Sequence, residues 1–272
     1  MLIDELQAGV FEEVDRFLDN ERGRLNAYIL IDGAFVPGLY KEFGVEKGEA
    51  NVQVLFKELP GADDDVLNVS PFVFHLESMT PKMRTLLRRC GGWPMLSLIE
   101  SDESLHLLAE RLASWCIVAN DGVRFNFRFA DTRRLPAIVQ TLGTGQLGSM
   151  FGSARRIRYI NRFGDWEYLD LPGSARKITT RPQTIMSPQF SKLVEDGEVD
   201  VIVGQLKGLG YMSDWKSSTQ FVHVASAVSA AVAGKLTAEE TLEWCKASVQ
   251  LKISTPTTIV AELEQWRSNI AT

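Results

Sequence analysis

The hydrophobic pattern of this 272-residue chain changes near residue 171, and that change constrains the fold more than any other feature. Before it, short apolar runs of strand length alternate with amphipathic helical segments, whereas after it apolar residues recur only at helical spacing. The stretch between, 171–188, contains three prolines and few large apolar side chains, which is typical of a linker. We therefore expect an α/β (α+β) N-terminal lobe, 1–172, with a mixed sheet flanked by helices, and an all-helical C-terminal lobe, 173–272.

Strand and helix signals alternate along the N-terminal lobe. The expected strands are residues 27–32, 52–57, 71–76, 94–100, 115–120, 123–130, 156–161 and 166–171. The expected helices are residues 2–20, 80–90, 102–115, 131–142 and 145–151, with a further helix or turn at 35–43. Thr80, Ser101 and Asp131 are expected to cap the helices that follow them. Asp121-Gly122, between two expected strands, predicts a tight hairpin.

The C-terminal lobe carries helical patterns alone. They predict helices at about 188–195, 197–209, 217–233, 237–252 and 257–269. Thr237 and Glu240 have the spacing of a capping box, and Thr257 is expected to cap the last helix.

Composition and charge narrow the class of protein. With 29 basic and 35 acidic side chains, the net charge is −6, which does not suggest a nucleic-acid-binding protein. Three cysteines lie far apart in apolar surroundings and are expected to be reduced core thiols. The acidic N-terminus is unlike a signal peptide, and the longest apolar stretch, 221–234, is too short to cross a bilayer. We expect a soluble, cytoplasmic protein that binds neither membrane nor nucleic acid.

Arginine is concentrated in one part of the N-terminal lobe. Residues 122–162 contain eight arginines and a single acid, Asp131, while residues 1–75 contain 15 acidic and 6 basic side chains. The arginines either pair with the acidic N-terminal third or form a surface for an acidic partner. On the second interpretation, Arg155 and Arg156 are candidate partner-binding residues.

No recognisable catalytic motif is complete. The segment GTGQLG (143–148) fits a dinucleotide-binding pattern, but a helical segment precedes it where a strand is required. Gly143 is therefore better explained as the end of that helix. The three histidines are isolated from one another, which favours packing over metal ligation: His75, His106 and His223. No cofactor, metal ion or catalytic residue is expected.

Two acids at the ends of expected strands leave one enzymatic alternative open. Asp32 and Asp131 are where an α/β phosphoryl-transfer or hydrolytic enzyme could hold a nucleophile or a magnesium ligand. No recognisable motif surrounds either residue, and an Asp in such a place is more often a turn former.

The stretch VRFNFRFADTRRLP (123–136) combines an apolar face with charges at its end. Its aromatic face, Phe125, Phe127 and Phe129, is expected to pack in the core. Arg128 and Arg133 are expected to form ion pairs with Asp131 or Asp32 that fix the strand–helix corner. A direct contact with a partner is the second interpretation, and catalysis is the third.

Five blocks between about residues 26 and 160 resemble the effector adaptor (chaperone) family of bacterial type VI secretion, in order and spacing. They are YILIDGA (28–34), Val69–Leu76, Trp93–Ser97, Phe127–Leu135 and Leu147–Arg156. Pro94 stands where the family commonly has Gly. The C-terminal third matches no recognisable family, which is similar to the variability of the family there.

The resemblance implies a protein that is not an enzyme. Members of the family bind a toxic effector in the cytoplasm and help to load it onto the spike protein (VgrG) of the injection apparatus. The partners implied are therefore an effector and VgrG, with the C-terminal lobe as a variable client-recognition region.

A client could lie in an apolar groove with a charged rim. The helix expected at 217–233 carries a stripe of Phe221, Val224, Val228 and Val232 that could line such a groove. The alternative is that this helix is the core of its own lobe. Trp215 is a further candidate anchor, because Trp is enriched among binding hot spots.

Overall fold

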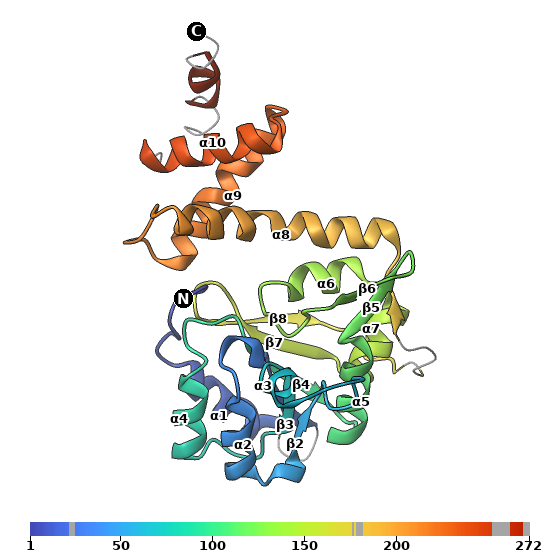
Figure 1. The fold of residues 1–272 in the computed structure, drawn as a ribbon. Coiled ribbons are helices and arrows are strands. Elements are labelled where there is room, and N and C mark those ends of the chain that lie inside the picture. Colours follow the sequence, from blue (N-terminus) through green and yellow to red (C-terminus); the bar gives the residue numbers. More distant parts are fainter. Residues whose placement is uncertain (22–24, 176, 178–181, 252–261, 269–272) are drawn as a thin grey trace. The chain divides into compact units, whose positions relative to one another are not determined.

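The computed structural model describes every residue except 22–24, 176, 178–181, 252–261 and 269–272 (Figure 1). The chain divides into two compact units, Met1–Leu193 and Val194–Thr272. The first contains sheets flanked by helices, and the described part of the second is helical, as the sequence predicts.

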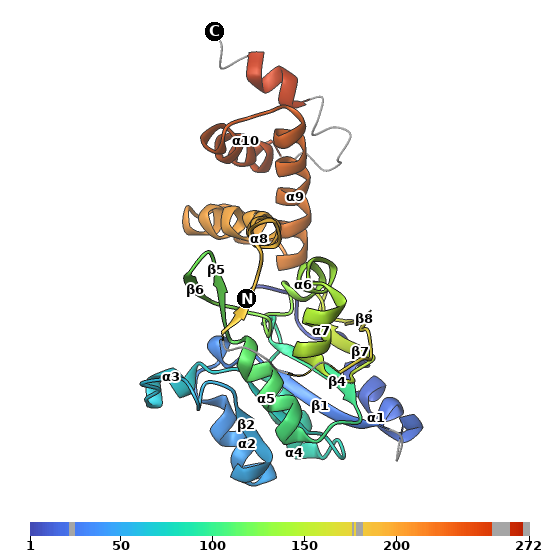
Figure 2. The ribbon, with the colours of Figure 1, turned by 90° about the vertical axis from the view of Figure 1, so that its right-hand side faces the viewer.

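The first unit is built on a six-stranded sheet with the order β2-β3-β1-β4-β7-β8. Every neighbouring pair in this sheet is antiparallel. Its strands are β1 (Asn26–Ile31), β2 (Val52–Val54), β3 (Phe72–His75), β4 (Leu96–Ser101), β7 (Arg156–Ile160) and β8 (Trp166–Asp170). The central strands β1 and β4 are buried almost throughout, as expected for runs of Ile and Leu, while β2 and β8 lie at opposite ends of the sheet (Figure 2).

Helices cover both faces of this sheet, because successive residues of a strand point to opposite faces. Ile29 and Ile31 of β1 belong to one core, together with α1, α2 and α4. Tyr28 and Leu30 belong to the other, together with α5, α6 and α7. Figure 1 shows α1, α2 and α4 on one side of the sheet and α5 and α7 on the other. The helices are α1 (Val10–Glu21), α2 (Leu39–Lys47), α4 (Pro81–Arg88), α5 (Leu105–Trp115), α6 (Leu135–Thr141) and α7 (Thr144–Phe151), with short turns η1 (Gly33–Phe35), η2 (Glu49–Asn51) and α3 (Asp64–Asn68).

A second, three-stranded sheet contains the predicted hairpin. Strands β5 (Ile117–Asn120) and β6 (Val123–Asn126) are antiparallel, and β5 pairs in parallel with β9 (Gln183–Thr184). Asp121 and Gly122 both have positive φ, 47° and 79°, as a tight two-residue hairpin requires.

The segment predicted as a linker contributes to the first unit. β9 lies within it, and directly after it the Phe190 ring lies 4.6 Å from that of Phe125 and the Gln189 side chain donates to the Thr141 carbonyl at 3.0 Å. The division at Leu193 therefore lies beyond the boundary predicted at residue 172.

Several predicted helix starts are wrong, each for a local reason. The helix expected from residue 2 begins only at Val10, because the N-terminal residues make backbone bonds elsewhere: the Leu2 N–H donates to the Gly92 carbonyl at 2.9 Å. Ser101 is the last residue of β4, and Ser104 caps α5. Thr80, in contrast, caps α4 as predicted.

Two turn predictions around α6 also fail. Asp131 does not cap this helix, which begins four residues later in the sequence, at Leu135. Gly143 was predicted to end α6, but Leu142 is the C-cap of that helix. Gly143, with φ −71°, is the N-cap of α7. A helix does precede GTGQLG, as expected.

The second unit is a helical core around Trp244. α8 (Ser187–Gly208) replaces two predicted helices and continues from the first unit into the second; α9 (Ser217–Ala233) and α10 (Ala238–Gln250) follow, then a helical segment at 262–268. The Thr237–Glu240 capping box is confirmed, whereas Thr257 lies outside the described residues. Among the residues that the structure describes, no helix has the length and apolarity needed to cross a membrane. All three cysteines are buried and free, as predicted.

The buried His223 gives a test of the second unit. Its Nε2 lies 3.1 Å from the Ser248 hydroxyl, and burial lowers its pKa below the ordinary value of 6.5. Because the unfolded chain binds a proton more readily, the stability that His223 contributes is present above pH 6.5 and is lost as the pH falls below that value. One such group costs less than about 1.4 kcal/mol per pH unit.

We expect thermal unfolding followed between about pH 7.5 and pH 5 to show this loss, and His223→Gln to reduce it. His75, whose pKa burial also lowers, is unchanged in that variant and provides the reference. An unchanged pH dependence in His223→Gln would contradict the assignment.

Candidate partner-binding site

Asp32 is a buried carboxylate at the end of the central strand β1. It is 2% exposed, and burial raises its pKa, which the neighbouring Arg128 partly opposes. Its Oδ2 accepts from Arg128 Nη2 at 2.7 Å, and its Oδ1 accepts from the Ala34 N–H at 3.0 Å. Asp32 therefore caps the η1 turn and anchors an arginine from a segment 96 residues away.

Asp131 forms the other half of this corner. Its carboxylate accepts from Arg133 Nε at 3.0 Å and Nη2 at 2.7 Å, a two-bonded pair. Arg128 Nη2 also lies 3.9 Å from Asp131 Oδ2, so one guanidinium bridges the two aspartates. The predicted pairing of Arg128 and Arg133 with Asp131 and Asp32 is confirmed. Asp131 also accepts from the Arg133 N–H at 3.1 Å, which makes it a turn former.

An aromatic stack covers the outer side of this corner. The Arg128 guanidinium carbon lies 4.9 Å from the centre of the Phe35 ring, which is stacked at 5.9 Å on Trp93. Phe35 and Trp93 are half-buried, and the Arg128 side chain is 42% exposed. We call Phe35, Trp93 and Arg128 the charged–aromatic surface. Tryptophan and arginine are among the residue types enriched at binding hot spots, which makes this surface a candidate partner-binding site.

Position 33, directly after Asp32, has room only for glycine. A Cβ at position 33 would lie 2.2 Å from the Ser70 carbonyl oxygen, which belongs to the backbone and cannot rotate away. The close approach sets where η1 starts and thus where Phe35 lies.

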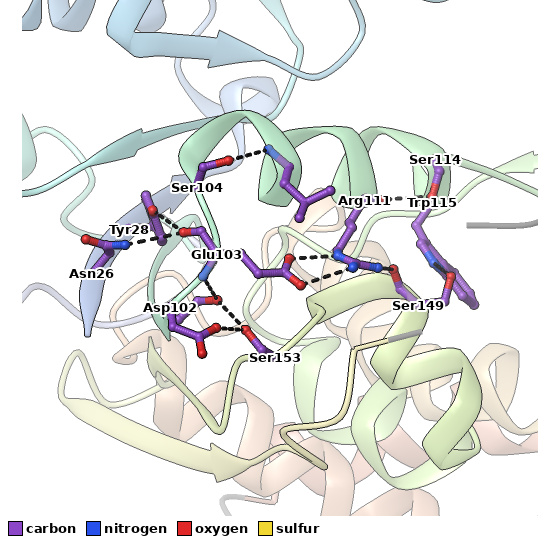
Figure 3. Close-up of polar contacts among 12 residues, drawn as sticks. Asn26, Tyr28, Asp102, Glu103, Ser104, Arg111, Ser114, Trp115, Ser149 and Ser153 are labelled. Atoms are coloured by element: carbon purple, nitrogen blue, oxygen red, sulfur yellow. Dashed lines mark hydrogen bonds and ion pairs between the residues drawn. The ribbon is translucent and has the colours of Figure 1, made fainter. Parts of the chain in front are cut away.

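A second charged pair, which was not predicted, lies buried beside the sheet (Figure 3). Arg111 of α5 donates to Glu103 through Nε at 2.7 Å and Nη2 at 3.0 Å. Both side chains are less than a tenth exposed. Arg111 Nη1 also donates to the Ser149 carbonyl of α7 at 3.4 Å, so the pair joins α5, α7 and the segment after β4. Glu103 precedes α5 and is eight residues from Arg111, so the pair lacks the i,i+3 or i,i+4 spacing by which a helix ion pair is predicted.

The backbone of Glu103 is held as firmly as its side chain. Its carbonyl accepts from the Tyr28 hydroxyl at 2.6 Å and from the Asn26 amide at 3.3 Å, both of β1 (Figure 3). Gly152, with φ 61°, leaves room for the carboxylate, because a Cβ there would lie 2.3 Å from Glu103 Oε2. Gly152 lies in Leu147–Arg156, one of the five blocks that resemble the adaptor family. This block is the only sequence signal that pointed to the region around the Glu103–Arg111 pair.

The predicted stripe on α9 has two buried residues, while its last residue, Val232, is 67% exposed. Val224 is fully buried and Val228 is 8% exposed, and both belong to the core of the second unit. Phe221 is half-buried, and the half-buried Trp215 packs edge-on against His223 at 5.1 Å. Burial of the two valines contradicts their accessibility to a partner and favours the alternative, a core helix.

The two arginines predicted to bind a partner, Arg155 just before β7 and Arg156 at its start, differ in their contacts. Arg155 is exposed, whereas Arg156 lies 3.3 Å from Asp170 Oδ1 and 4.7 Å from the centre of the Tyr168 ring. Arg158 pairs with Glu100 at 2.9 Å. Several arginines of the 122–162 cluster are thus held by acids, and only some of those acids come from the N-terminal third.

Both aspartates of the enzymatic alternative are engaged in hydrogen bonds. Their oxygens accept hydrogen bonds from arginines, and over the described ranges no group of three His, Cys, Asp or Glu side chains is placed to hold a metal ion. The arginine contacts favour a structural role for Asp32 and Asp131.

One known family matches the part of the chain that contains this site. Residues 27–149 match the model of a family described as a domain of unknown function (DUF4123). This family is known for adaptor-like and chaperone-like proteins of type VI secretion, which agrees with the resemblance of the five blocks. The matched segment contains the charged–aromatic surface, both aspartates and the Glu103–Arg111 pair. No curated protein and no solved structure matches the chain.

We expect Arg111→Met to lower the free energy of unfolding by about 3–5 kcal/mol, because it leaves the Glu103 carboxylate buried without a cation. The double variant Glu103→Leu with Arg111→Met should lose less than the single variant. Arg156→Met, which removes a pair with the exposed Asp170, is the matched control and should cost less than about 1 kcal/mol. Urea unfolding of the first unit measures all three, and a small loss in Arg111→Met would refute the role of the pair.

Gly33→Ala should destabilise the first unit by about 1–3 kcal/mol, since the new methyl group meets the Ser70 carbonyl. Gly145→Ala is the control: a Cβ at this position of α7 meets nothing within 4 Å, and alanine favours a helix. Equal unfolding midpoints for the two variants would show that the close approach at Gly33 is unimportant.

Proposed function

We propose that this protein is a cytoplasmic, non-catalytic adaptor that binds a type VI secretion effector and helps to load it onto the VgrG spike. The observation that carries the proposal is the location of the charged–aromatic surface within the segment matched by the family model. The ion pairs of Asp32 and Asp131 add support, because they give these acids a structural role in place of a catalytic one.

The charged–aromatic surface suits the capture of a protein segment. Arg128 is held at one edge by Asp32 and lies against Phe35, so its position is set before a partner arrives. Fixing a side chain in advance lowers the conformational entropy lost on binding. The Phe35 and Trp93 rings offer apolar contact area, while the exposed part of Arg128 orients an acidic or carbonyl group of the client.

The helical unit is proposed to determine which client is bound. It lies outside the matched segment, and its helix α9 exposes Val222 and Val232, at 50% and 67%, in addition to its buried core. Variation in such an exposed region changes client choice without disturbing the first unit.

The first test is complex formation. The purified protein should form a stoichiometric complex with the effector encoded beside it and, in a separate experiment, with a C-terminal segment of the associated VgrG. Failure of both complexes under mild conditions would argue strongly against the adaptor function.

The second test locates the binding surface. Phe35→Ala should weaken effector binding at least about tenfold in calorimetry, as expected for a central aromatic anchor. Phe163→Ala, which truncates a phenylalanine that is 54% exposed and outside the matched segment, should leave the affinity unchanged. Equal affinities for the two variants would remove the charged–aromatic surface from the effector interface.

A further inference from the structure

The strand β8 ends the main sheet with an open edge. Its neighbour β7 bonds with alternate residues: the Leu171 N–H donates to the Arg155 carbonyl at 2.8 Å, and the Asn161 N–H donates to the Asp165 carbonyl at 2.9 Å. In an antiparallel ladder this pattern directs the backbone groups of the even-numbered residues away from β7. These residues are Trp166, Tyr168 and Asp170.

Most of these outward groups have no partner among the described residues. The Trp166 N–H donates to the Asp165 carboxylate at 2.9 Å, which leaves the Trp166 carbonyl and both backbone groups of Tyr168 and Asp170. The side chains are accessible too, since Tyr168 is 57% exposed and the Asp170 side chain 74%.

At the opposite edge of the sheet, formed by β2, backbone groups are bonded within the chain. At β2 the Val52 N–H donates to the Glu49 carbonyl, and the Val54 carbonyl accepts from the Lys57 N–H at 3.4 Å, so the chain itself occupies part of that edge. Proteins commonly block an edge in this way, or with lysine, proline or a bulge. The β8 sequence, WEYLD, contains neither lysine nor proline.

We propose that β8 pairs with β8 of a second copy of this chain, antiparallel and centred on Tyr168. The N–H and carbonyl of Tyr168 then bond with those of its copy, and each Asp170 N–H donates to the Trp166 carbonyl of the other copy. Four of the five free groups on each copy are thus paired across a twofold axis, and the Asp170 carbonyl, opposite the Trp166 N–H that donates to Asp165, stays open to water.

Side-chain chemistry selects this register. It sets Asp170 opposite Trp166 and Glu167 opposite Leu169, so no acid directly faces an acid. The two Tyr168 rings meet, each with Arg156 on its other side. A shift one way opposes the two Glu167 carboxylates. A shift the other way places Pro172, which has no N–H, opposite the free Trp166 carbonyl.

Strand pairing of this length buries little surface, so the dimer is concentration-dependent. Sedimentation equilibrium should show the mass rising from 30.4 kDa toward twice that value as the concentration increases into the micromolar range. Tyr168→Pro removes an N–H that β7 does not use and should yield a folded monomer. Tyr168→Thr, which keeps the N–H and the strand preference, should still dimerise.

A charge exchange tests the register itself. Tyr168→Lys and Tyr168→Glu each oppose like charges across the axis and should be monomeric alone, while an equimolar mixture of the two should form a mixed dimer. Circular dichroism confirms that each variant is folded.

A wild-type protein that stays monomeric throughout this range overturns the proposal. So does a dimer that Tyr168→Pro leaves intact, since another surface then holds it. If Tyr168→Pro instead abolishes effector binding by a monomeric wild-type protein, the edge receives a strand of the effector and pairing between copies is refuted.

Discussion

The first unit depends on a buried carboxylate that needs a cation. Asp32 ends the central strand β1 almost without solvent, and burial alone disfavours its charge. Arg128, from a distant segment, forms an ion pair with Asp32 and also lies within ion-pair distance of Asp131. Because one guanidinium serves both acids, the end of β1, the η1 turn and the chain before α6 are fixed relative to one another. The Phe35 ring lies against this guanidinium and is stacked on Trp93.

The Glu103–Arg111 pair performs a comparable role at another point of the same sheet. It joins α5 to α7 and, through the Glu103 carbonyl, to β1. A buried ion pair is weak support for stability in itself, but it imposes one geometry, since either charge alone would be costly. The two junctions differ in exposure: the Arg128 side chain is 42% exposed, whereas Glu103 and Arg111 are both buried.

The sequence predicts what depends on local pattern and misses what depends on distant contacts. The buried strands, the β5–β6 hairpin and the Thr80 cap follow from periodicity and turn chemistry, and all are present. The start of α1 could not be predicted, because residues 2–7 bond to backbone far along the chain. The pairing of Arg128 with Asp32 could be anticipated from strand ends. The stacking on Trp93 and the Glu103–Arg111 pair could not, since no spacing in the sequence encodes them.

The return of residues 183–193 to the first unit has a practical consequence for anyone who would isolate it. A fragment cut where the proline-rich stretch begins would lose β9, leaving one side of β5 without its parallel neighbour and the Phe125 ring without Phe190. Such a fragment would expose the apolar Phe125 ring and an unpaired edge of β5, both of which favour aggregation. The compact first unit ends at Leu193, within the first two turns of α8.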